Sequence, residues 1–152
     1  MRRYWLKTYI RFSRIRMKSK ITYCDKELII EDPHKIICMG YDQIALISTN
    51  KPYLQITTID RKTIIFDGLI AELKKNLPDF FFCCNRSILV NLLYVTTFEK
   101  ICNKYQIHIT VLDKTINIAS EYNDLFKRKL IEIKNCTSLS PLCLFCKKAY
   151  SN

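Results

Sequence analysis

The chain has 152 residues, which is enough for one domain with a sizeable core. It carries 25 Lys and Arg against 14 Asp and Glu, and a formal charge of +11 favours a polyanionic partner, either nucleic acid or an anionic membrane surface. With 2 His, 2 Gly and no paired-carboxylate signature, the common catalytic constellations and glycine-rich phosphate loops are absent, so an enzyme is the weak hypothesis.

The N-terminal segment, residues 1–24, is predicted to be a basic, aromatic arm. Lys and Arg recur through residues 1–20, which contain no acidic residue, and aromatic side chains such as Tyr4 and Trp5 lie between them. Such an arm can lie on phosphates, sit at a membrane interface or pack against its own domain, and the pattern leaves all three open. Basic residues interrupt every apolar stretch after Met1, so no signal peptide or spanning helix is expected.

Short apolar runs separated by turn residues predict a β-dominated domain over residues 25–134. Between them, Asp32-Pro33 and Asn50-Lys51-Pro52 mark breaks, and Asn103-Lys104 is expected to turn a hairpin. The expected strands are residues 27–31, 35–39, 43–49, 53–59, 63–66, 92–98, 105–112 and 115–118.

Two helices are expected among these strands. Residues 68–77 place apolar side chains on one face and end before Pro78, with Asp67 as the candidate N-cap. Residues 121–134 repeat apolar side chains at spacings of three and four, with Ser120 as the candidate N-cap. The expected architecture is therefore many short strands in small sheets, one short helix in mid-domain and one C-terminal helix.

Residues 80–91 have the most distinctive sequence in the chain. It is an aromatic run followed by Asn85-Arg86-Ser87, an apolar triplet and Asn91. The pattern indicates strand, turn and strand. Two interpretations are open: an ordinary solvated turn, which residue types alone favour, or polar side chains held outward on a rigid base to read a ligand. His108, between Ile107 and Ile109, falls on the opposite face of its strand and is expected to be solvated or hydrogen-bonded rather than catalytic.

Eight cysteines without a signal peptide indicate free thiols in a reducing cytoplasm. Residues 135–152 are expected to be a tail. Within it, Cys143 and Cys146 have the C-x-x-C spacing of a zinc site and Cys136 could be a third ligand, but no nearby His completes the set. Surplus thiols are the preferred interpretation, and no metal or other cofactor is expected. A thiol switch that uses this pair, or Cys83 and Cys84, is a separate hypothesis.

The order of these parts resembles the LytTR family of bacterial DNA-binding domains. The most specific match is residues 81–91, with Asn85-Arg86-Ser87 and Val90-Asn91. The other matching parts are residues 41–47, 67–73, 95, 107–112 and 116–120. The resemblance implies a mostly antiparallel fold of about ten strands. It also implies that loops between strands, rather than a recognition helix, read the major grooves of double-stranded DNA.

By the same resemblance, three residues are expected to contact bases and four to contact the DNA backbone. The base-reading residues are Tyr53, Arg86 and Tyr122, and the backbone partners are Lys51, Asn85, Ser87 and Asn123. The family usually has His at the position of Asn85 and often Arg at that of Cys83, so specificity is expected to rest more heavily on Arg86. Asn91 is expected to be structural.

Family members usually carry a receiver domain or a membrane segment ahead of this module. About 34 residues precede the resemblance here, so a stand-alone cytoplasmic regulator is expected, driven by its own abundance or by a separate sensor or regulatory protein. A homodimer on repeated sites is compatible with this hypothesis. The alternative function is an adaptor that binds RNA or a membrane surface through the basic arm.

Overall fold

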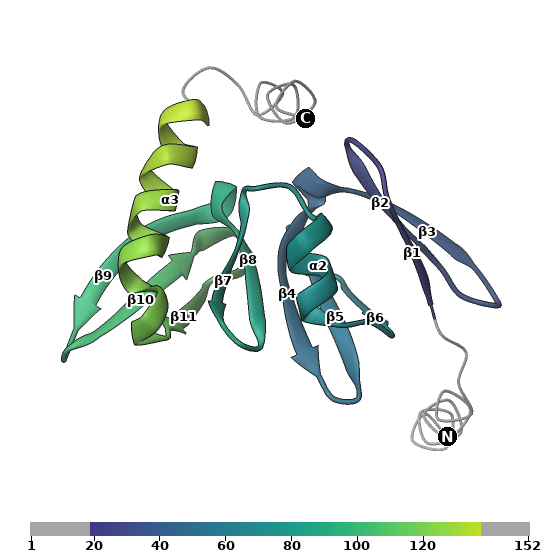
Figure 1. Ribbon diagram of the computed structural model, residues 1–152, viewed down its shortest axis with the longest axis horizontal. Coiled ribbons are helices and arrows are strands. Elements are labelled where there is room, and N and C mark those ends of the chain that lie inside the picture. Colours follow the sequence, from purple (N-terminus) through teal and green to yellow (C-terminus); the bar gives the residue numbers. More distant parts are fainter. Residues whose placement is uncertain (1–18, 138–152) are drawn as a thin grey trace.

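The computed structural model describes residues 19–137, which form three antiparallel sheets and two α-helices (Figure 1). The first sheet has the order β1-β2-β3, with β1 Lys20–Tyr23, β2 Glu27–Glu31 and β3 Ile36–Gly40. The central sheet has the order β6-β5-β4-β8-β7, with β4 Ile44–Asn50, β5 Tyr53–Thr58, β6 Thr63–Phe66, β7 Phe81–Asn85 and β8 Ile88–Asn91. The third has the order β11-β10-β9, with β9 Val95–Ile101, β10 Lys104–Ile109 and β11 Lys114–Ile118. The mainly β prediction is confirmed.

The central sheet is covered on both faces, which explains why β4 and β8 read as continuous apolar runs. Side chains alternate between the faces of a strand, yet Leu46 and Ile47 are both buried. Phe82, on the face of Leu46 and Val90, lies edge-on to the ring of Phe126, with 5.6 Å between centroids. That contact brings the C-terminal helix α3, Asn123–Thr137, onto this face.

The short helix α2, Ile70–Asn76, packs against β7 and β8 through the buried Leu73. The prediction that Asp67 caps this helix is wrong. The N-cap is Leu69 in an extended conformation, with no side-chain hydrogen bond, and Asp67 lies two residues earlier. Gly68 also lies outside the helix, in a tight space where a Cβ would stand 3.2 Å from the Phe66 ring.

Ser120 is also not an N-cap. It begins a 3-10 turn, η4 (Ser120–Tyr122), whose own N-cap is Ala119, and α3 starts after that turn. Three further 3-10 helices overlap the ends of segments predicted to be strands, the first of them only at Gln43. They are η1 Tyr41–Gln43, η2 Leu92–Tyr94 and η3 Thr110–Leu112.

The β9–β10 hairpin turns at Cys102 and Asn103, not at Asn103 and Lys104. Both residues have positive φ, 52° and 64°, as a two-residue hairpin turn with a right-handed twist requires. Asn at the second position suits this geometry, and Lys104 already belongs to β10.

Strand β1 was not predicted and lies inside the expected N-terminal arm. It pairs with β2 along its whole length, from Lys20 opposite Glu31 to Tyr23 opposite Leu28. The Ser19 hydroxyl accepts a 3.3 Å hydrogen bond from the Asp67 backbone and ties this strand to the end of β6. Residues 1–18 of the arm lie outside the described residues, as do Cys143 and Cys146.

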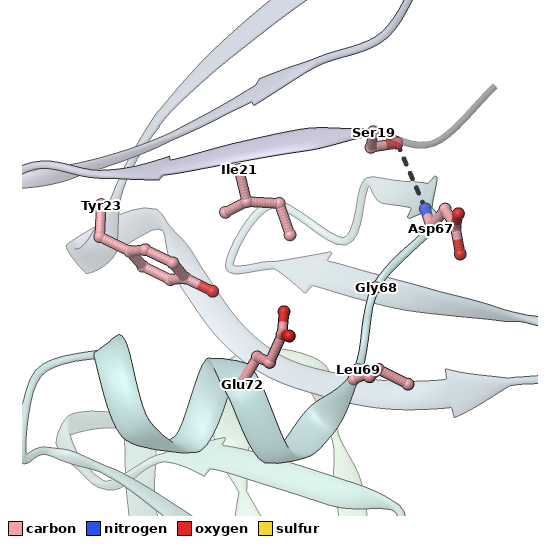
Figure 2. Close-up of a pocket in the computed structure, with 7 residues that line it drawn as sticks. All are labelled: Ser19, Ile21, Tyr23, Asp67, Gly68, Leu69 and Glu72. Atoms are coloured by element: carbon pink, nitrogen blue, oxygen red, sulfur yellow. Dashed lines mark hydrogen bonds between the residues drawn. The ribbon is translucent and has the colours of Figure 1, made fainter.

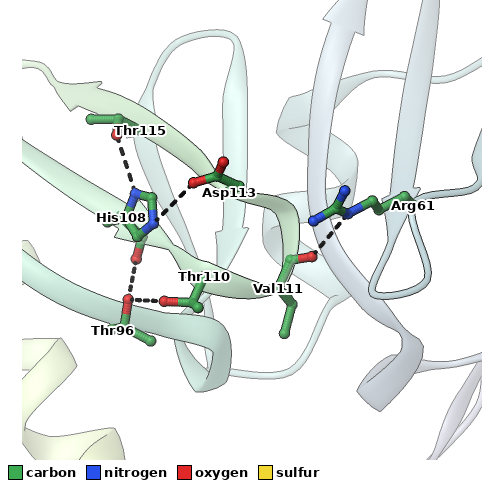
Figure 3. Close-up of polar contacts among 7 residues, drawn as sticks. All are labelled: Arg61, Thr96, His108, Thr110, Val111, Asp113 and Thr115. Carbon is green, nitrogen blue, oxygen red and sulfur yellow. Dashed lines mark hydrogen bonds and ion pairs between the residues drawn. The ribbon is translucent and has the colours of Figure 1, made fainter.

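Polar side chains of the third sheet contact one another, and one of its turns contacts the β5–β6 turn of the central sheet (Figure 3). His108 lies 3.2 Å from the Thr115 hydroxyl through Nδ1 and 3.7 Å from Asp113 through Nε2, while Ile107 and Ile109 are buried on the other face. The prediction of a hydrogen-bonded strand histidine is therefore confirmed. Arg61 Nε donates to the Val111 carbonyl at 3.3 Å and joins the β5–β6 turn to η3.

Candidate nucleic-acid interface

Three segments far apart in the sequence meet at one edge of the central sheet, here called the loop edge: residues 50–53, 85–88 and 119–123. The Thr49 N–H donates to the Ser87 carbonyl at 2.9 Å and joins the first two segments. The Ala119 N–H donates to the Cys84 carbonyl at 2.9 Å and joins the third. In Figure 1 the tips of the β4–β5 and β7–β8 hairpins and the first turn of α3 all face the lower side of the molecule. The fold therefore brings all seven predicted site residues to one edge.

The β7–β8 hairpin forms a rigid central projection of the loop edge. Its turn consists of Arg86 and Ser87, and the Asn85 carboxamide oxygen accepts from the Ser87 N–H at 2.8 Å. The strands behind it are anchored in the core, because Phe81 and Leu89 are buried. An Asx-type turn of this kind fixes the backbone of the tip with local hydrogen bonds.

Arg86 is exposed at the tip, and within residues 19–137 its guanidinium has no hydrogen bond or ion pair. The planar group offers five N–H donors in a fork that matches two acceptors side by side. A free fork on a fixed hairpin suits the O6 and N7 atoms of guanine, or a phosphate.

The β4–β5 turn holds Lys51 and Tyr53 beside this projection. Lys51 is exposed and follows Asn50, whose amide donates to Gln55 at 3.1 Å. Tyr53 is half-buried, and its hydroxyl is buried without a hydrogen-bond partner. In this conformation the ring, rather than the hydroxyl, faces the outside. A buried hydroxyl with no partner is costly, so a rotamer or a bridging water that satisfies it would be favoured.

The third segment places Tyr122 and Asn123 at the start of α3. Tyr122 is half-buried, and the Lys74 ammonium of α2 lies 5.8 Å from its ring centroid. Such a cation–π contact restrains the ring and adds a positive charge beside it. The Asn123 side-chain oxygen is buried without a partner. Lys74 was not singled out from the sequence, because helical periodicity shows only that it faces solvent and not that α2 lies near Tyr122.

The polar groups of the central hairpin are not all available to a ligand. The Asn85 oxygen and the Ser87 N–H are used in the turn, and the Ser87 carbonyl accepts from Thr49. Besides the Arg86 guanidinium, the Asn85 amide nitrogen and the Ser87 hydroxyl remain, and both can donate hydrogen bonds to phosphate oxygens.

The positive charge of the chain is unevenly distributed. Residues 19–137 contain 16 Lys and Arg and all 14 acidic residues, a formal charge of +2, whereas residues 1–18 contain 7 Lys and Arg and no acid. The loop edge itself contributes Lys51 and Arg86, with Lys74 close by. The described domain therefore has little net positive charge of its own, and few cations lie at the loop edge.

A separate pocket of about 320 Å³ lies between β1 and the start of α2 (Figure 2). Asp67 and Glu72 line it together with Tyr23, whose pKa is raised by burial and by the nearby Glu72 carboxylate. Two carboxylates repel anions. This pocket is unsuited to a phosphate, and the loop edge is the better candidate for nucleic acid.

Cysteine chemistry has little support in the described part of the chain. Cys83 and Cys84 are buried, and burial raises the pKa of both thiols, which keeps them in the unreactive protonated form. No group of three or more His, Cys, Asp and Glu side chains within residues 19–137 has a metal-binding arrangement. In the same residues, no helix is long and apolar enough to cross a membrane.

The fold defines a β-sheet module in which two hairpin turns and the start of α3 form one edge. The family model of the LytTr DNA-binding domain matches residues 34–131, and the chain belongs to this family. Among solved structures, it is similar to the LytTr DNA-binding domain of a Bacillus cereus protein described as a methyl-accepting/DNA response regulator, with 14% identity and a TM-score of 0.59. That match covers 69% of this chain and 96% of the other. A search of curated proteins gave no match.

Proposed function

We propose that this protein is a transcriptional regulator that binds specific sequences in double-stranded DNA and reads the major groove through the loop edge. Membership of a DNA-binding family supports binding to DNA. The observation that carries the finer proposal is the placement of Arg86, exposed and unpartnered within the described domain, at the tip of an anchored hairpin between two other candidate reading segments.

In this proposal the three segments have different tasks. Arg86 donates to guanine O6 and N7, and Tyr53 and Tyr122 make the flanking base contacts. Lys51, Asn85, Ser87 and Asn123 hold the phosphates and set the register of the domain on the duplex. The protein acts in the cytoplasm, on repeated sites, and its input comes from a separate sensor or regulatory protein.

The test is a selection of bound sequences from a pool of random duplexes, followed by titration of the selected site. We expect Arg86→Ala to lose about 1–3 kcal/mol of binding free energy and to relax preference at one base position. Arg86→Lys keeps the charge but removes the fork, so most of the loss should remain.

The control for net charge is Lys26→Ala, since Lys26 is exposed in the turn between β1 and β2, on the upper side of Figure 1, away from the loop edge. It should leave the base preference unchanged. A wild-type protein that selects no sequence would contradict the proposal, and so would an Arg86→Ala variant that binds the selected site as tightly as the wild type.

A further inference from the structure

Strand β3 has an open edge. Two hydrogen bonds set the phase of its ladder with β2: Asp32 N–H to the Lys35 carbonyl and Tyr41 N–H to the Lys26 carbonyl, each 3.0 Å. Hydrogen-bonded pairs alternate along an antiparallel ladder, so Ile37 and Met39 bond to β2. The backbone groups of Ile36, Cys38 and Gly40 therefore point away from it.

Among the described residues no strand pairs with this edge. The Gly40 N–H is satisfied by the Gln43 side chain at 3.2 Å, but the N–H and C=O groups of Ile36 and Cys38 have no protein partner within residues 19–137. The Ile36 side chain is 63% exposed and Cys38 is exposed.

Protein edges are usually protected by charges, prolines, bulges or a covering segment. β3 contains no charged residue and no proline, and its ladder with β2 has no register shift. Other ends of sheets differ. Strand β9 carries Glu99 and Lys100, and β7 is covered at Cys84 by the chain at Ala119. Strand β6 is shorter and ends at Phe66, opposite Leu54 and next to the loop edge.

We propose that β3 pairs in antiparallel fashion with β3 of a second copy of this chain, about a two-fold axis through Ile37. In this register Ile36 lies opposite Cys38 of the second copy, and the outward backbone groups of both residues are satisfied in both copies. The two exposed Ile36 side chains then pack beside the two Cys38 side chains on one face of the joined sheet.

The other face supports the same register. Ile37 is half-buried and packs against the core, and at the two-fold axis it meets Ile37 of the second copy in the closer, non-hydrogen-bonded type of pair. No charged residue of β3 faces a like charge across this junction, because the strand has none. The edge is thus complementary to itself, as a two-fold interface must be.

The joined sheet leaves the loop edge open. In Figure 1 the first sheet lies to the right of the central sheet, and the tips of the β4–β5 and β7–β8 hairpins face elsewhere. A dimer of this kind carries two loop edges and gains avidity on two DNA sites. The pairing itself requires no DNA, so it is tested separately from the proposed function.

The test is the mass of the full-length protein in solution without DNA, measured by sedimentation over a range of concentrations. We expect a wild-type dimer and an increase of about tenfold or more in the dissociation constant of Ile36→Lys, because two ammonium groups enter the apolar patch. Ile65→Lys is the matched control, since Ile65 is 52% exposed on another uncharged edge strand, β6. This control should remain dimeric.

A second variant tests the register directly. Ile37→Cys, made together with Cys38→Ser, places cysteines at the axis about 4.5 Å apart between Cα atoms, which is within disulfide range. Under mild oxidation it should form a linked dimer that Cys38→Ser alone does not form. A monomeric wild-type protein, a dimer that Ile36→Lys leaves intact, or a dimer broken by Ile65→Lys alone would overturn the proposal.

Discussion

At the scale of the residue, Asn91 shows how one side chain can organise a junction. It is fully buried, and its amide donates to the carbonyls of Ile44 at 2.8 Å and Tyr41 at 3.3 Å. Its oxygen accepts from the Leu93 N–H at 3.0 Å. One Asn thus joins η1, the start of β4 and η2, and the expectation that it is structural is confirmed.

The junction at Asn91 can be tested by removing its side-chain amide. Asn91→Ala should lower the free energy of unfolding by about 1–3 kcal/mol, because it leaves buried backbone groups without partners. Denaturation by urea measures the change. The matched control is Asn117→Ala, on the exposed side of β11, which should stay within about 0.5 kcal/mol of the wild type. Equal effects of the two substitutions would contradict the structural role given to Asn91.

The orientation of Tyr53 and Asn123 could not be predicted from the sequence. Motif order places both in loops, but whether a side-chain oxygen points outward depends on neighbours that the fold brings together. Here the Tyr53 hydroxyl and the Asn123 oxygen are both turned into the protein. The exposure of Arg86 could be predicted, because a long cationic side chain in a two-residue hairpin turn extends into solvent.

At the scale of the element, period-two runs bounded by Pro, Asn or Asp were sufficient to predict most of the strands. This pattern gave a wrong prediction where the backbone changes conformation without a change of residue type. In η3, residues Thr110–Leu112 continue the β-type sequence of β10. β1 was missed because four residues with alternating exposure give too short a signal beside a basic arm.

Helix α3 is predicted to be held mainly by Phe126. Its ring is fully buried, parallel to Phe98 at 5.8 Å and edge-on to Phe82 at 5.6 Å. Phe126→Ala should cost about 3–5 kcal/mol of folding free energy, from lost burial and the cavity left behind. Thermal or urea unfolding provides the measurement. The neighbouring Leu125 is 48% exposed, so Leu125→Ala should have a much smaller effect; a comparable loss in both would refute this account of how α3 is held.

At the scale of the whole molecule, the proposed reading surface and most of the net positive charge lie in different parts of the chain. The loop edge belongs to a domain with a formal charge of +2, while the basic residues of segment 1–18 precede the first strand. Base contacts set specificity, and phosphate contacts supply salt-dependent affinity that does not depend on sequence. We therefore expect the two properties to be separable by deletion.

Deleting residues 1–18 from the full chain tests this separation. If the arm lies on DNA phosphates, the slope of log affinity against log salt should become less steep by up to about 6, since each neutralised phosphate contributes roughly 0.9 and the segment has 7 basic residues. The selected base sequence should stay the same, because Arg86 and its neighbours are untouched. Titrations at several salt concentrations measure the slope, and repeated selection measures the preference. An unchanged slope would show that the arm does not bind the duplex, and loss of the preference would show that reading is not confined to the loop edge.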